Sequence, residues 1–147
     1  MEPTFQHARH SDIASRVRQN AGSAAIAAAL LIYFGFFRLL EPAGTDLFNR
    51  AGWLFYHTLR IGGVAMALVA AGSLIGHPRV LLIDALISTT IGVLLILTGL
   101  AMAADGGAMM QTIINVLCGG FFASAGIRNW REYTAFGHRG NSPPPPP

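Results

Sequence analysis

The sequence predicts an all-α membrane protein built as a bundle of four transmembrane helices. More than half of the 147 residues are hydrophobic (52%) and only 12% are charged, which is about half the charged fraction usual in soluble domains. The charges are also unevenly placed, because four long apolar runs are separated by short polar segments. Runs of this kind suit a lipid bilayer as solvent. We therefore expect a multi-pass integral membrane protein.

The first span is predicted at residues 21–40. Residues 1–20 before it are polar and basic, and we expect them to form a cytoplasmic tail. The apolar run is too long for the core of a signal peptide, and no small-residue cleavage site follows it. Arg38 follows the run and is expected to mark a membrane interface.

The second span is predicted at residues 53–76. It begins with Trp53, Phe55 and Tyr56, which are typical of the aromatic belt at a membrane surface. Its uncharged part, residues 61–76, is about 24 Å long at 1.5 Å per residue. This is short for a hydrocarbon core of about 30 Å. Arg60 should therefore lie near the outer boundary, reaching toward the interface or held by a partner.

The third and fourth spans are predicted at residues 80–104 and 108–127. His77, Pro78 and Arg79 precede the third span and indicate a tight turn, since proline suits the first turn of a helix. The transmembrane domain then covers residues 21–133. Residues 134–147 end in five prolines, which favour an extended, flexible cytoplasmic tail.

The arginines predict the orientation of the helices. With the N-terminus inside, the cytoplasmic side holds Arg9, Arg16, Arg18, Arg79, Arg128, Arg131 and Arg139. The outer side then holds Arg38, Arg50 and Arg60. An excess of basic residues marks cytoplasmic loops, and the short connections favour neighbours that run in opposite directions. We expect an antiparallel up-down bundle with both ends in the cytoplasm, its interface charges being Arg38, Arg60, Arg79 and Arg128.

Small residues at a spacing of four predict faces where helices pack closely. They allow two backbones to approach, and van der Waals contact then drives association in lipid. The expected packing residues are Gly63, Ala67, Ala71, Gly72, Gly76, Gly119 and Ala123. Two interpretations stay open: packing inside the four-helix bundle, and contact with another subunit.

Asp84 is the main candidate for a functional residue, because it lies about 9 Å into the third span at 1.5 Å per residue. An ionisable group inside a membrane is a functional hypothesis by default, and it could carry a proton or bind a cation. The alternative is an ion pair with Arg79 or Arg128 that joins helices. Ser88 shares the face of Asp84. Gln111 and Asn115, one turn apart on the fourth span, complete the candidate intramembrane polar site.

Several classes of function are not indicated. The common catalytic motifs are absent from the sequence, so we do not expect an enzyme. We expect no cofactor and no metal, since His57 has no partner histidine at matching depth. The scattered arginines argue against nucleic-acid binding. Cys118 is the single cysteine and is expected to be a small buried packing residue.

Two hypotheses about function follow. The first is a structural or accessory subunit of a larger membrane complex, or a homo-oligomer. The second is a small transporter or ion-conducting oligomer that uses the polar residues around Asp84 and Asn115. All ten basic residues are arginine, which suggests a GC-rich bacterial genome, and we expect the protein in the inner (cytoplasmic) membrane. The expected partners are the lipid bilayer and other membrane subunits or further copies of the chain.

Overall fold

The computed structural model describes residues 3–37, 46–104 and 109–140, and these residues form four helices joined in part by a turn at 76–78. Side chains are described for residues 14–36, 52–104 and 109–135. The helices are α1 (Pro3–Phe37), α2 (Asp46–Ile75), α3 (Arg79–Ala104) and α4 (Met109–Gly140). Each contains a stretch long and apolar enough to cross a membrane. The prediction of an all-helical chain with four membrane-spanning candidates is confirmed.

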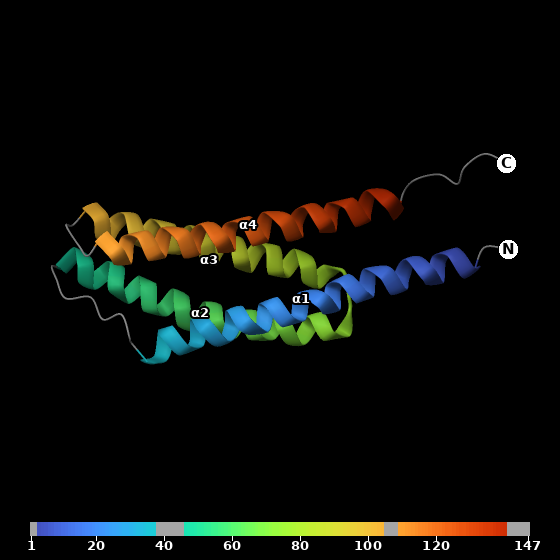
Figure 1. The fold of residues 1–147 in the computed structure, drawn as a ribbon, viewed down its shortest axis with the longest axis horizontal. Coiled ribbons are helices and arrows are strands. Elements are labelled where there is room, and N and C mark those ends of the chain that lie inside the picture. Colours follow the sequence, from blue (N-terminus) through green and yellow to red (C-terminus); the bar gives the residue numbers. More distant parts are fainter. Residues whose placement is uncertain (1–2, 38–45, 105–108, 141–147) are drawn as a thin grey trace.

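The helices pack as two pairs. The most extensive contacts are between α3 and α4 and between α1 and α2, and the pairs meet mainly through α2 and α3. Figure 1 shows the start of α1 and the end of α4 at the same end of the long axis. The core between the pairs is apolar and includes Leu31, Phe55, Leu59, Met66, Ile91 and Leu95.

Glycines set the closest approach of α3 to α4. A Cβ atom added at Gly92 would lie 2.5 Å from the backbone nitrogen of Ala123. One added at Gly119 would lie 2.7 Å from the carbonyl oxygen of Gly92. Neither distance is possible for a real side chain, so these two backbones touch where only glycine fits. Gly119 and Ala123 thus pack within the chain.

Gly63 has the same role between α1 and α2. A Cβ atom there would lie 3.0 Å from the backbone nitrogen of Ile32. Further along the pair, Arg60 lies beside Gly35 and Gly76 beside Ala14. Residues late in α1 therefore meet residues early in α2.

The connection between α2 and α3 is the tight turn that the sequence predicts. Gly76 has a φ of +78°, a left-handed conformation that glycine adopts without strain. It therefore ends α2 instead of packing inside the helix. The amides of Val80 and Leu81 donate to the carbonyls of His77 and Pro78, and these bonds start α3.

The outer helices are longer than their predicted spans. α1 begins at Pro3, so most of the segment expected as a tail is helical, and α4 continues to Gly140. Proline suits the first helical position, and glycine commonly follows the last turn. Between these ends each added residue gains a backbone hydrogen bond, which propagates a helix once it has started. The proline run and Arg38 lie outside the described residues.

Three of the expected packing residues do not bring two backbones together within the described chain, which leaves contact with another subunit as the open interpretation for them. Ala67 and Ala71 are exposed, because a strict spacing of four advances by about 40° per step around a helix of 3.6 residues per turn. Gly72 leaves room for a side chain, since an added Cβ would lie 3.5 Å from Val80. Cys118 is exposed on α4, which corrects the expectation of a buried thiol.

Candidate functional site

Asp84 lies on the buried face of α3. This face contains Leu81, Ala85, Ser88 and Gly92 as well, at the spacings of three and four that bring residues to one side of a helix. The Asp84 side chain is only 2% exposed. The helix therefore directs a carboxyl group into the bundle, within a stretch suited to span a membrane.

Three side chains from three helices donate hydrogen bonds to the Asp84 carboxylate. The Ser88 hydroxyl, one turn along α3, donates to Oδ1 at 2.8 Å. The Asn129 amide of α4 donates to Oδ2 at 2.8 Å. The Asn20 amide of α1 donates to the same Oδ2 oxygen. We call these four residues the Asp84 cluster.

The orientation of Asn20 is held by a second contact. The Ser23 hydroxyl lies 3.1 Å from Asn20 Oδ1 and 2.9 Å from the Asn20 carbonyl. A contact to the amide oxygen leaves the nitrogen end of Asn20 turned toward Asp84, which fits donation to a carboxylate. α2 closes the cluster with an apolar group, because Met66 Sδ lies 3.8 Å from Ser88 Oγ.

The donors to Asp84 are all neutral. This differs from the ion pair expected with Arg79 or Arg128, whose side chains are both exposed. A buried polar group is stable when hydrogen bonds satisfy it, and bonds to a charged group are worth about 1.5–3 kcal/mol each. The cluster thus satisfies both oxygens of Asp84 and ties α1 and α4 to α3.

The sequence contains a signal for two partners that were missed. Asn20 lies directly before the first predicted span and Asn129 just after the fourth, while Asp84 lies near the beginning of the third. The hydrogen bonds to Asp84 show that all three lie at the same level of the bundle. Matching polar residues by depth would have brought them together.

The other half of the predicted polar site lies elsewhere. Asn115 is 2% exposed and donates to the sulfur of Met102 at 3.3 Å. Ser88 and Met102 are separated by about 21 Å of α3, at 1.5 Å per residue. Gln111 is half-buried one turn from Asn115. Asp84 and Ser88 therefore belong to one polar cluster, and Asn115 and Gln111 belong to a second, separate one.

Two arginines bind the ends of neighbouring helices. Arg60 of α2 donates to the Gly35 carbonyl at 2.8 Å, and its guanidinium carbon lies 5.2 Å from the centre of the Phe36 ring. Arg18 of α1 donates to the Leu74 carbonyl at 3.3 Å. Both carbonyls belong to last turns, whose acceptors lack helical partners. Each helix of this pair thus caps the other, and Arg60 has the partner that its depth requires.

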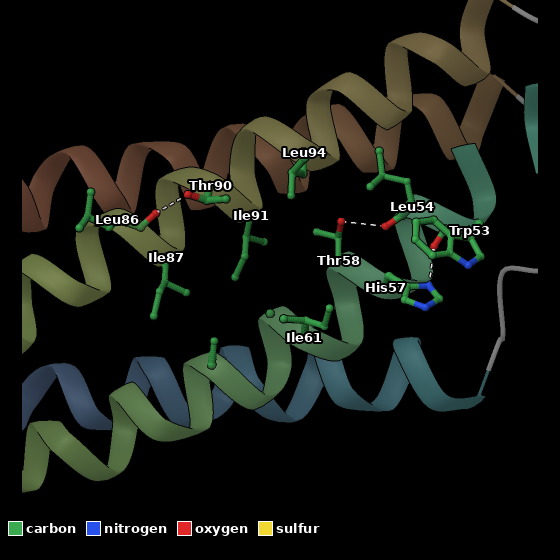
Figure 2. A pocket seen from close by; sticks show the side chains of 12 residues that line it. Trp53, Leu54, His57, Thr58, Ile61, Leu86, Ile87, Thr90, Ile91 and Leu94 are labelled. Atoms are coloured by element: carbon green, nitrogen blue, oxygen red, sulfur yellow. Dashed lines mark hydrogen bonds between the residues drawn. The ribbon is translucent and has the colours of Figure 1, made fainter. Parts of the chain in front are cut away.

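An open groove of about 440 Å³ lies between α2 and α3. Residues 53–65 form one wall and residues 86–94 the other. Figure 2 shows Trp53 and His57 at one end of it, with their rings stacked at a centroid distance of 4.1 Å. Ile91, which is 3% exposed, belongs to its floor. The wall surface is almost entirely apolar.

The described residues contain no group of three or more histidine, cysteine, aspartate or glutamate side chains placed to hold a metal ion. No family model, no curated protein and no solved structure matches this chain. The fold and the two places described above, the Asp84 cluster and the groove, are therefore the basis for assigning a function.

Proposed function

We propose that this chain is a structural or accessory protein of the inner (cytoplasmic) membrane, which docks through its helices onto another membrane subunit or onto copies of itself. The observation that carries the proposal is the Asp84 cluster. Its carboxylate accepts hydrogen bonds from α1, α3 and α4, so the chain's own donors occupy both oxygens. A group held in this way stabilises a bundle.

The outward faces of the helices supply the docking surface. Only 17% of the α4 span is buried within the chain, against 39% for α2 and α3. Gly120 is exposed on α4, and nothing lies within 4 Å of a Cβ atom added there. Ser124 follows four residues later and is also exposed. Small residues at this spacing are typical of contacts between membrane helices, and Ala67 and Ala71 form a comparable stripe on α2.

The proposal includes an antiparallel up-down bundle with both ends in the cytoplasm. The order of contacts between α1 and α2 supports it, and so does the common position of the two ends in Figure 1. The exposed arginines Arg16, Arg18, Arg79, Arg128 and Arg131 support the cytoplasmic assignment of that end, because basic residues are enriched there.

Purification of the tagged chain from its native membrane in a mild detergent tests the proposal. We expect a complex larger than the 15.6 kDa chain, containing either a stoichiometric second subunit or a fixed number of copies. Gly120→Leu should weaken this complex, because the larger side chain separates the two backbones. Gly22→Leu is the matched control, since Gly22 is equally open but lies on α1. A wild-type chain that stays monomeric throughout would refute the proposal.

A second candidate function is a small transporter or ion-conducting oligomer that uses the polar residues around Asp84 and Asn115. One observation favours it: Asp84 is an ionisable residue that is 2% exposed and lies within a candidate membrane span. Such a group could take up a proton or a cation, and intramembrane acids are common in ion pathways. Flux in proteoliposomes made with wild-type and Asp84→Asn protein separates the two functions.

A further inference from the structure

We propose that five arginines at one end of the bundle bind the phosphate groups of anionic phospholipids, with Arg128 and Arg131 as the principal site. They lie at the end that holds the start of α1 and the end of α4 (Figure 1). All five are exposed, and we call them the arginine layer: Arg16, Arg18, Arg79, Arg128 and Arg131. The inference goes beyond the docking function, because it concerns lipid headgroups and not another membrane subunit.

The Asp84 cluster fixes the relative heights of these arginines. Asn20 of α1 and Asn129 of α4 donate to the same oxygen of Asp84 in α3, so the three residues lie at one level. Counting along each helix at 1.5 Å per residue places the arginines from about 1.5 Å inside this level to about 7.5 Å outside it. Arginines of three helices therefore share one layer about 9 Å thick.

The level of Asp84 coincides with one edge of the hydrocarbon core. α3 ends at Ala104, 20 residues after Asp84, and α4 begins at Met109, 20 residues before Asn129. Each stretch is about 30 Å long at 1.5 Å per residue, which is the thickness of the core. Trp130 lies beside Asn129 and is 47% exposed, as is typical of tryptophan at a membrane surface.

The arginine layer therefore occupies the headgroup region. A bilayer is about 40–45 Å thick with its headgroups and about 30 Å without them, so each headgroup layer is about 5–7.5 Å thick. The arginines extend outward from the edge of the core over the same distance. The anions at this depth are those of lipid headgroups. A nucleic acid or a soluble acidic protein would lie farther from the core, so the depth favours lipid.

The chain supplies few negative charges to neutralise the arginine layer. Among the residues with described side chains, the carboxylates are Asp84 and Glu132. Asp84 is 2% exposed and accepts its hydrogen bonds from neutral donors, which leaves the half-buried Glu132. At least four of the five arginines thus have no carboxylate in this part of the chain. A guanidinium is always charged and binds phosphate with two parallel hydrogen bonds.

Arg128 and Arg131 form the best placed pair. They are three residues apart on α4, so their side chains are neighbours on one side of the helix. Asn129 between them is buried against α3, whereas both arginines are exposed. Two positive charges this close repel each other. A phosphate between them replaces the repulsion with two attractive contacts, which a single arginine cannot provide.

Native mass spectrometry of the chain in mild detergent tests the proposal, with phosphatidylglycerol and phosphatidylcholine added at equal concentrations. We expect the wild-type chain to bind phosphatidylglycerol preferentially. Each basic residue near an anionic surface is worth about five-fold in binding, so Arg128→Gln with Arg131→Gln should lower this affinity about 25-fold. Replacing both with lysine keeps the charge and should preserve more of the affinity. Equal binding of the two lipids by the wild-type chain would overturn the proposal.

The matched control removes the same charge from the segment between the first and second spans. Arg38→Gln with Arg50→Gln is suitable, because Glu41 and Asp46 accompany these arginines in the sequence, and it should keep the preference for phosphatidylglycerol. An equal loss in both double variants would mean that net charge alone attracts the lipid, and this would refute the site. If circular dichroism shows that the first double variant misfolds, Arg131→Gln alone should lower the affinity about five-fold.

The same spectra separate this proposal from its alternatives. An acidic protein that copurifies with the wild-type chain and is lost with Arg128 and Arg131, while bound lipid is unchanged, would assign the arginines to a protein partner and overturn the proposal. A complex of the expected mass without a lipid preference would refute lipid binding alone. A monomer that prefers phosphatidylglycerol would support it and refute the docking function alone.

Discussion

Asn129 of α4 donates a hydrogen bond at 2.8 Å to Oδ2 of Asp84 in α3, across 45 positions of the sequence. The same oxygen accepts from Asn20 of α1. Few direct contacts link α1 to the second helix pair, which meets the first mainly through α2. One carboxylate oxygen thus joins two helices that belong to different pairs. The stability of this bundle should depend on Asp84 more than on any exposed charge.

Replacing Asp84 should destabilise the fold in a graded way. Asp84→Ala removes the acceptor for three donors, of which Ser88 and Asn129 are buried, and an unsatisfied buried polar group costs about 1–3 kcal/mol. Asp84→Asn should cost less than Asp84→Ala, because its amide oxygen still accepts from one donor. Unfolding in detergent, followed by circular dichroism, measures both. Thr90→Val is the control, since Thr90 is exposed and bonds only within its own helix.

A different result for Asp84→Asn would favour the second candidate function. If the Asp84→Asn protein is as stable as wild type and has lost a proton or cation flux in proteoliposomes, Asp84 is a conducting group. We expect instead that any loss of function follows the loss of folded protein.

The two asparagines should be energetically coupled. Asn20→Ala and Asn129→Ala each remove a donor to the same oxygen, so the double variant should not show the sum of the two effects. Residues of one hydrogen-bond network usually interact by about 0.5–3 kcal/mol. A double-mutant cycle in the unfolding assay measures this energy. Strict additivity would mean that the two amides act independently, against the shared acceptor described above.

Neighbouring glycines on α4 should differ in how strongly alanine destabilises the chain. Gly119→Ala places a Cβ atom against the Gly92 carbonyl, and overpacking of this kind costs about 1–3 kcal/mol. Gly120→Ala meets no atom within 4 Å and should change the stability of the single chain little. The same unfolding assay compares them. Equal effects would show that the α3–α4 contact is looser than described.

The orientation can be tested by labelling single cysteines in intact cells, with Cys118 first replaced by serine. Cysteines at positions 48 and 106 should react with an impermeant reagent from outside, whereas those at positions 10 and 138 should not. The arginine distribution is the physical reason for this expectation. External reaction at position 10 or 138 would contradict the cytoplasmic assignment of the chain ends.

The four spans were predictable because length and hydropathy decide them locally. The buried face of α3 was also predictable, since Asp84, Ser88, Gly92 and Gly99 follow helical spacing and all four are buried. The partners of Asp84 were not predicted. Asn20 and Asn129 flank apolar runs, where polar residues are usual, and only the relative depth of separate helices brings them to one carboxylate.

The packing glycines show a second reason why the sequence alone did not predict every contact between helices. Gly72 and Gly76 have the spacing of four that is common in contacts between membrane helices. However, Gly76 ends its helix and Gly72 has space around it. The close contacts lie instead at Gly63, Gly92 and Gly119. Which small residue faces a neighbour depends on how each helix is rotated about its axis, and spacing within one helix does not contain this information.

The residues of the Asp84 cluster are synthesised one after another, because a ribosome makes the chain from its N-terminus. Asn20 is synthesised before Asp84, so one amide already exists when the acidic residue leaves the ribosome. Asn129 comes 45 residues later, and Asp84 has only part of its final shell until α4 is made. A nascent chain arrested before residue 129 should therefore hold α3 less firmly than the finished protein does, and release of the last helix completes the assembly.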